Sequence, residues 1–463
     1  MENYNAQIER IKSKFGEAKE KDKKFKTFGA NFHRYKLGEP AKPSEVERFE
    51  RAHDITLPDD FKAFLTMFTN GGSSGSQDSA PGPYYGIYSL IGLEPEYAGC
   101  LAKPAVVKPK MTDEEWGYIG GRLRSGGDLS DEEYDEILRN MNAGLLSIGT
   151  QGCTYYTALV LNGEYRGRLV NMNQEGGKPH FCFENNFLDW YERWLDEIIS
   201  GQLMTNDLHQ FGFTMGGTEQ YLLDRYIEAQ TDEDRYDSLA GLTEKHQLSE
   251  ETIQRLLFIY PDLHDLVYKR LVLSLLTKHA YERAKPFLLD FIEEDLLDVY
   301  QFVYWYAKPN MGEWFDIVRE NMDKIGDNER LYHFSCFLLQ GSGRDYASVI
   351  LPFTKHKEAS IRKITYYQLG ELSNKRDYLD YLIQGLYDEE NAVIHTCIQA
   401  MHNIKDKRLL LEYKRLIDKF PVDQNSILIN ISHWLKDINL TEQQIREMNP
   451  EEVRQYEPKW VAR

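Results

Sequence analysis

The feature that most constrains the fold of this chain is a repeated apolar pattern in its second half. The segment IRKITYYQLGEL at residues 361–372 recurs 32 positions later (393 − 361 = 32) as VIHTCIQAMHNI at residues 393–404. Apolar or small residues at positions 1, 5 and 9 of each copy lie on one face of a helix. A single helix pair cannot bury such a face, so the pattern predicts stacked helical repeats. Looser copies begin at Val267, Val299, Leu331 and Ile427.

The copy at IRKITYYQLGEL resembles HEAT-type α-solenoid repeats. Position 5 is small in several copies, where Ser335, Thr365 and Cys397 occur, and we expect neighbouring helices to approach closely there. The resemblance implies an all-α HEAT-like solenoid. A helical domain without repeats is the alternative.

The first half of the chain predicts helices followed by strands. Pro43-Ser44-Glu45 predicts a helix start, with Ser44 as N-cap and Glu47 at the capping-box position. Leu57-Pro58 predicts a second helix, which ends at Asn70-Gly71-Gly72 because Gly and Asn tolerate a left-handed backbone. The apolar stripe of this second helix consists of Phe61, Phe64, Leu65 and Phe68.

Residues 144–173 predict a hairpin, with Thr157, Leu159 and Leu161 on one face and Asn162-Gly163 at the turn. The segment FLDWYERWLDEI at residues 187–198 then predicts an amphipathic helix. The buried stripe expected for this helix contains Phe187, Leu188, Tyr191, Trp194, Leu195 and Ile198.

Three segments in this order resemble the SUKH superfamily, which includes the fungal Smi/Knr cell-wall regulators and many bacterial toxin-immunity proteins. The segments are EVERFERAHDITLPDDFKAFLTMFTNGG, GLLSIGTQGCTYYTALVLNGEYRGRLV and FLDWYERWLDEI. The resemblance covers about residues 40–200 and implies an α+β domain with a central sheet, without catalytic machinery, that binds another protein. A long insertion before the hairpin departs from the family pattern.

The expected organisation is therefore an α+β SUKH-like domain followed by an all-α HEAT-like solenoid domain. A linker is expected where Gly212, Gly216 and Gly217 interrupt both kinds of pattern. The predicted parts are a basic helical segment at residues 1–40, the SUKH-like domain at 41–205 with an acidic insertion at about 73–142, the linker at 206–220 and the helical repeat domain at 221–463.

The net charge of the chain is 55 − 74 = −19, which argues against binding to bare nucleic acid and favours a basic protein partner. Nine acidic residues fall between Asp113 and Glu136, interleaved with aromatic residues that are typical interface anchors. The alternative is an ordinary solvated helix face with its aromatic side chains packed inward. The candidate partner-binding residues are Asp113, Glu114, Glu115, Trp116, Tyr118, Asp131, Glu132, Glu133 and Tyr134; the cluster also contains Asp128, Asp135 and Glu136.

No catalytic, metal or cofactor site is predicted. Cys153 with His180 as its base would be a nucleophile, but nothing in the sequence lowers the thiol pKa, and we expect a small buried residue at a strand start. Asp189 and Glu192 are expected to be charges on a solvated helix face. The histidines form no HExxH motif, and the five cysteines form no CxxC pair.

We expect a cytoplasmic protein that does not interact with membranes, because residues 1–15 lack a signal-peptide core and no run of eighteen apolar residues occurs. The predicted function is a non-enzymatic immunity protein that neutralises a basic bacterial toxin domain, such as a nuclease, by direct binding. The alternative is a scaffold or regulator of the Smi/Knr type that acts on cell-envelope or assembly processes. The sequence leaves the oligomeric state open.

Overall fold

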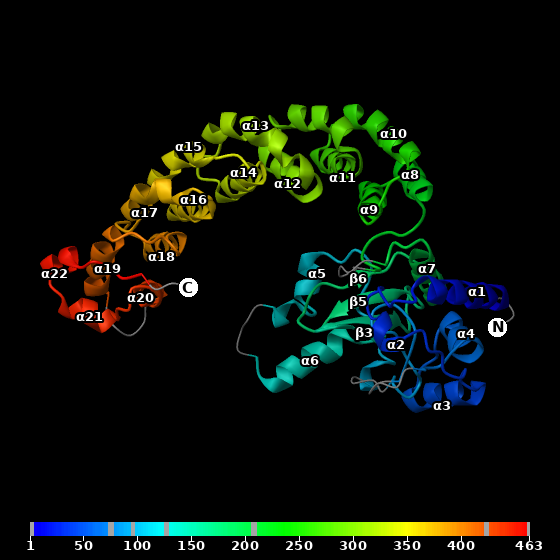
Figure 1. The fold of residues 1–463 in the computed structure, drawn as a ribbon. Coiled ribbons are helices and arrows are strands. Elements are labelled where there is room, and N and C mark those ends of the chain that lie inside the picture. Colours follow the sequence, from blue (N-terminus) through cyan, green and yellow to red (C-terminus); the bar gives the residue numbers. More distant parts are fainter. Residues whose placement is uncertain are drawn as a thin grey trace. The chain divides into compact units, whose positions relative to one another are not determined.

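The computed structural model describes residues 4–72, 78–93, 98–124, 129–204, 211–420 and 426–460. Asp128 and residues 206–210, the start of the expected linker, lie outside the described residues. The chain forms two compact units, one spanning residues 1–271 and the other residues 272–463. The first unit contains all the strands found in the described residues (Figure 1).

The first unit combines helices with two antiparallel sheets. Its α-helices are α1 (Asn5–Lys21), α2 (Ala30–His33), α3 (Pro43–His53), α4 (Asp59–Met67), α5 (Asp113–Gly117), α6 (Asp131–Met141), α7 (Phe187–Ile199), α8 (Glu219–Glu228), α9 (Asp232–Thr243) and α10 (Glu250–Ile259). The short 3-10 helices are η2 (Ala98–Cys100), η3 (Gly121–Leu123) and η4 (Tyr260–Asp262). The strands are β1 (Ser79–Ala80), β2 (Ile87–Tyr88), β3 (Leu145–Gly152), β4 (Tyr155–Val160), β5 (Leu169–Asn173) and β6 (His180–Phe181).

The main sheet has the order β3-β4-β5-β6, with neighbouring strands antiparallel. Residues 144–173 therefore form three strands and two turns instead of one hairpin. The additional turn follows Gly152 and contains Cys153, whose φ of 50° places it in the left-handed region. The expected turn at Gly163 is present, within a longer loop in which Asn162 donates a hydrogen bond to the Lys103 carbonyl at 2.8 Å.

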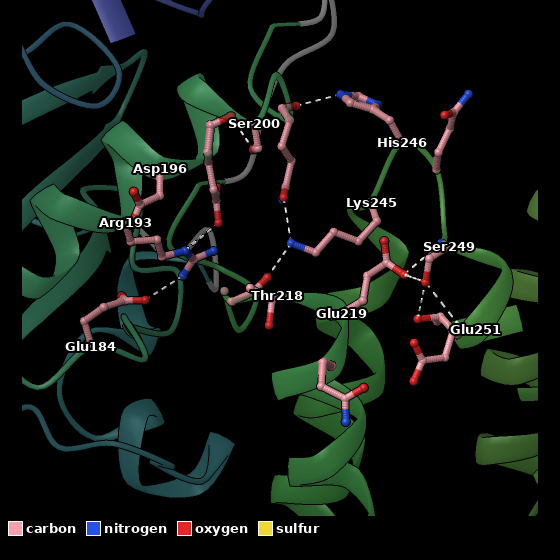
Figure 2. Close-up of a pocket in the computed structure, with 17 residues that line it drawn as sticks. Glu184, Arg193, Asp196, Ser200, Thr218, Glu219, Lys245, His246, Ser249 and Glu251 are labelled. Carbon is pink, nitrogen blue, oxygen red and sulfur yellow. Dashed lines mark hydrogen bonds and ion pairs between the residues drawn. The ribbon is translucent and has the colours of Figure 1, made fainter. Parts of the chain in front are cut away.

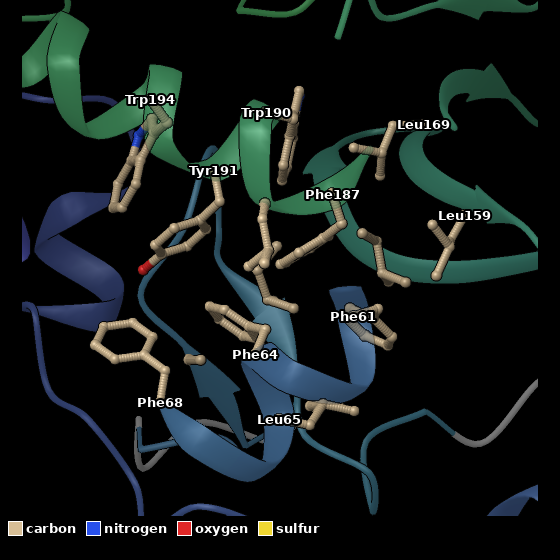
Figure 3. Packing of buried hydrophobic residues seen from close by; sticks show 14 of the residues in the cluster. Phe61, Phe64, Leu65, Phe68, Leu159, Leu169, Phe187, Trp190, Tyr191 and Trp194 are labelled. Carbon is tan, nitrogen blue, oxygen red and sulfur yellow. The ribbon is translucent and has the colours of Figure 1, made fainter. Parts of the chain in front are cut away.

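Both faces of this sheet are buried, because apolar side chains alternate between two clusters. Leu159 and Leu169 belong to the cluster that includes α1, α4 and α7, as Figure 3 shows for α4 and α7. Ala158, Val170 and Met172 belong to the opposite cluster, which the insertion supplies with residues from α5 and α6. The later part of the insertion, which contains α5 and α6, thus covers the second face of the sheet, whereas Ala80, Ile87 and Leu101 in its earlier part belong to the first cluster.

Aromatic side chains join α4 to α7 (Figure 3). The ring of Phe187 lies 4.8 Å from that of Phe61 and 4.9 Å from that of Phe64. The buried carboxylate of Asp60 accepts a hydrogen bond of 2.7 Å from the backbone N–H of Phe187. The helix predicted after Leu57-Pro58 is present, although it ends at Met67 and not at Asn70-Gly71-Gly72. All six residues expected on the buried stripe of α7 are buried.

Two local predictions were wrong. Helix α3 has Lys42 as its N-cap, because Pro43 occupies the first helical position and Glu45 accepts the Lys42 N–H at 2.8 Å. Glu192 is not a solvated charge: its carboxylate pairs with Arg10 at 3.1 Å and with Lys14 at 3.0 Å. These contacts hold α1 on α7, and the inward face of α1 buries Ile8, Ile11, Phe15 and Ala18.

The second unit is helical throughout its described residues. It begins within α11 (Leu266–Phe291), which Ala280 interrupts with a non-helical backbone. Its other α-helices are α12 (Leu296–Tyr306), α13 (Phe315–Glu320), α14 (Glu329–Gly341), α15 (Ala347–Ile350), α16 (Ala359–Glu371), α17 (Leu379–Gly385), α18 (Asn391–Ala400), α19 (Arg408–Lys419), α20 (Ser426–Lys436), α21 (Glu442–Glu447) and α22 (Pro450–Gln455). The 3-10 helices are η5 (Lys308–Trp314), η6 (Met322–Lys324), η7 (Leu351–Lys355) and η8 (Lys375–Tyr378).

Five of the six predicted copies begin with a buried residue and fall on α12, α14, α16, α18 and α20. The sixth differs, because Val267 in α11 is 45% exposed. The small residues do permit close approach: Thr365 is buried and shares a hydrogen bond of 2.6 Å with the Tyr332 hydroxyl. A Cβ at Gly370 would lie 2.7 Å from the Cα of Ala400. This packing is consistent with a helical repeat domain.

Candidate protein-binding surface

The acidic residues of α5 begin a capped helix. The Thr112 side chain accepts the N–H of Glu115 at 3.1 Å, and the Glu115 carboxylate accepts the N–H of Thr112 at 2.9 Å. Glu115 also pairs with Lys108 at 2.6 Å, and Asp113 pairs with Lys178 at 2.8 Å. Hydrogen bonds from these lysines are the main cause that lowers the pKa of both carboxyl groups. Two of the three acidic side chains at the start of α5 therefore form ion pairs within the domain.

Helix α6 repeats this arrangement. The Ser130 side chain accepts the N–H of Glu133 at 3.3 Å, while the Glu133 carboxylate accepts the N–H of Ser130 at 3.0 Å and so has a lowered pKa. Arg122 of η3 lies 3.5 Å from Glu133. By contrast, the exposed carboxylates of Glu114, Asp131 and Glu132 make no ion pair with any residue that the structure describes.

The three aromatic candidates divide into two groups. Trp116 is only 3% exposed, belongs to the core against the sheet and donates its indole N–H to the Gly176 carbonyl at 2.8 Å. Its assignment as a partner-binding residue was wrong, since the apolar side of this short helix faces inward. Tyr118 is 80% exposed and Tyr134 is also exposed. We therefore define the acidic surface as Asp113, Glu114, Glu115, Tyr118, Asp131, Glu132, Glu133 and Tyr134.

Sequence reasoning missed the lysines that pair with this surface. Lys108 precedes the acidic cluster and Lys178 follows the sheet strand β5, so neither falls within the run of acidic residues. Lys110 likewise pairs with Glu233 of α9 at 2.9 Å. The loop that leads into α5 contains three lysines between residues 103 and 110. This was the only sequence signal that lysines pair with the acidic residues.

A polar cleft of about 1000 Å³ lies beside α7, α8 and α10 within the first unit (Figure 2). Arg193 occupies one wall and pairs with Glu184 at 2.8 Å and with Glu197 at 2.7 Å. Burial alone would lower the pKa of Arg193, but the two carboxylates outweigh it and raise that pKa. The Lys245 ammonium donates to the Gln202 side chain at 2.7 Å.

These contacts use the charged groups of the cleft to join α7 to the segment before α10. Glu219 adds to them by accepting the backbone N–H of Ser249 at 2.8 Å. Burial lowers the pKa of Lys245, and its ammonium also donates to the Gly217 carbonyl at 2.6 Å. Ion pairs and hydrogen bonds between the residues that line the cleft therefore join these segments of the first unit.

Cys153 differs from the expectation of a buried strand residue. It is exposed in the turn between β3 and β4. His180 lies on β6, where burial lowers its pKa.

Among the described residues, no group of three or more His, Cys, Asp or Glu side chains is arranged to hold a metal ion. None of the described helices is long and apolar enough to cross a membrane.

Comparison with known proteins adds a family to this geometry. Residues 40–193 match the model of the SMI1 / KNR4 family (SUKH-1). No curated protein matches the chain. Domains of this family are generally non-catalytic and bind other proteins. The matched residues contain α3, α4, the four-stranded sheet and the first half of α7, so this chain carries a SUKH-1 domain of the SMI1 / KNR4 family at residues 40–193.

Proposed function

We propose that this chain is a non-enzymatic cytoplasmic protein that neutralises a basic bacterial toxin domain, such as a nuclease, by binding it directly. One observation carries the proposal: the SUKH domain has an acidic surface in which Glu114, Asp131 and Glu132 are free of ion pairs among the described residues. Tyr118 and Tyr134 stand exposed beside them. Tyrosine is enriched among the residues that dominate binding energy at interfaces.

Charge explains how such a surface acts on a basic toxin. Clustered carboxylates raise the rate of association with a basic partner. This effect weakens at high salt, because salt screens the charges. A nuclease domain presents cations around its active site because its substrate is a polyanion. A stable complex requires an interface of about 1,600 Å² in total. Residues around the acidic surface therefore also have to contact the toxin.

Co-expression with a toxin domain encoded beside the gene tests the proposal. We expect the intact chain to protect cells and a triple variant, Glu114→Lys with Asp131→Lys and Glu132→Lys, to lose that protection. The control triple variant carries the same charge change at Glu164, Asp262 and Asp290, which are exposed outside the acidic surface. Equal killing with and without the intact chain would contradict the proposal.

The second candidate function is a scaffold or regulator of the Smi/Knr type. The helical second unit favours it, because its exposed aromatic residues Trp305, Tyr306 and Tyr367 offer a further surface for a protein. A gene located beside cell-envelope functions, with no toxin gene adjacent, would support this role over immunity.

A further inference from the structure

A second surface of the first unit has the opposite charge. Residues 21–37, KDKKFKTFGANFHRYKL, contain six Lys or Arg and one Asp, a local charge of 6 − 1 = +5 in a chain whose net charge is −19. Asp22 is buried, where it accepts a hydrogen bond of 2.9 Å from the Tyr35 hydroxyl. Lys24, Lys26 and Lys36 are exposed and make no ion pair with the described residues.

Aromatic rings lie among these cations. Phe25 is 39% exposed and Phe32 is 45% exposed. The ring of Phe32 packs edge-on against Tyr85 at 5.8 Å, and Phe28 packs against the same tyrosine at 5.5 Å. Exposed aromatic rings beside unpaired cations are typical of interaction sites on soluble domains. We call Lys24, Phe25, Lys26, Phe32, Lys36 and Tyr85 the basic-aromatic surface.

The backbone that presents this surface is held in place. Asp22 accepts the backbone N–H groups of Lys26 at 2.6 Å and Thr27 at 3.1 Å. Gly29 has a φ of 79°, and a Cβ there would lie 1.7 Å from the Tyr84 carbonyl oxygen, so only glycine fits. A preformed surface loses little entropy when it binds.

Backbone strain is concentrated in the same segment. Phe25, Arg34 and Tyr35 have φ values of 51°, 50° and 52°, in the left-handed region that residues with a Cβ rarely adopt. Such strain persists only where surrounding contacts fix it, and it clusters at sites of function. Here the buried side chains of His33 and Tyr35 anchor the strained backbone, because the Tyr35 N–H donates to His33 Nδ1 at 3.1 Å.

We propose that the basic-aromatic surface binds a short acidic segment of a second protein, in which Asp or Glu residues alternate with apolar ones. Lysines attract the carboxylates, and Phe25 and Phe32 contact the apolar side chains. The acidic character of the whole chain selects against longer polyanions. A nucleic acid or an anionic membrane extends beyond this surface over the rest of an acidic protein, whereas a short peptide contacts only the residues of the surface. This surface is separate in sequence from the acidic surface, and all of its residues except Tyr85 precede the family match, which begins at residue 40.

Fluorescence anisotropy with a labelled peptide of repeated Glu-Glu-Phe units tests the proposal on the full chain. We expect binding at low salt that weakens by about tenfold or more in Lys24→Glu/Lys26→Glu and in Phe32→Ala. The control Lys355→Glu/Lys363→Glu carries the same charge change at exposed lysines elsewhere and is expected to bind within about twofold of the unaltered chain. Circular dichroism establishes that every variant is folded.

Three results would overturn the proposal. The first is no peptide binding by the unaltered chain, and the second is an equal loss of affinity in the control variant. The third is tighter binding of phosphatidylserine vesicles or of a short single-stranded DNA than of the peptide. A matched peptide of Glu-Glu-Ser units measures the apolar contribution, and equal affinity for both peptides also counts against the role of Phe32. None of these outcomes bears on toxin neutralisation, which is measured by cell survival.

Discussion

Replacing Arg193 by Met tests whether the ion pairs of the polar cleft stabilise the first unit. The Arg193 guanidinium separates Glu184 from Glu197, and all three side chains are at most 12% exposed. Water therefore screens these charges only weakly. Removing one partner of a buried ion pair leaves an uncompensated charge and costs about 3–5 kcal/mol, so we expect a loss of that size at pH 7.

Urea unfolding followed by tryptophan fluorescence measures this effect, since Trp190 and Trp194 lie on α7 beside Arg193. A second variant that adds Glu184→Gln and Glu197→Gln removes the unpaired charges and should regain most of the loss. Arg139→Met is the control, because Arg139 and Asp135 form an exposed pair that contributes about 0–1 kcal/mol. A loss below about 1 kcal/mol for Arg193→Met, or no recovery in the variant that also carries both glutamines, would refute the reasoning.

Three further outcomes follow from the packing. Trp116→Ala should lower the free energy of unfolding by about 3–5 kcal/mol in urea titrations, whereas Tyr118→Ala should change it by about 0.5 kcal/mol or less. Burial is the main cause that raises the pKa of Asp60, so the contribution of Asp60 to stability should fall as pH rises above about 4. The stability of Asp60→Asn relative to the unaltered chain should therefore be higher at pH 7 than at pH 4 when unfolding is measured at both. Thr365→Leu should destabilise the second unit by about 1–3 kcal/mol in thermal unfolding, because it overfills the contact with Tyr332; no loss would contradict close packing there.

Elements with strong apolar periodicity were predictable from the sequence. Helices α4 and α7 lie where their stripes place them, because burying several aromatic rings outweighs local preferences. The three SUKH-like segments were also recognised in the correct order. The repeat pattern likewise placed α12, α14, α16, α18 and α20.

The failures have local physical causes. The turn at Cys153 uses a left-handed backbone at a residue that carries a Cβ, so its side chain gives no turn signal. Val267 matches the repeat in sequence but is exposed in α11. The ion pairs of Glu192 with α1 join residues about 180 positions apart, a distance over which charge patterns carry no information.

The acidic cluster shows how one sequence pattern serves two purposes. A carboxylate at the third position of a helix caps the N-terminus, which explains Glu115 and Glu133 without any partner. Capping does not explain Glu114, Asp131 and Glu132, whose side chains extend into solvent without ion pairs to described residues. The helix dipole favours each of them by about 0.3–1 kcal/mol, and this gain does not require an ion pair. These three carboxylates are therefore available to a partner, and a binding experiment should reverse their charge before that of the capping glutamates.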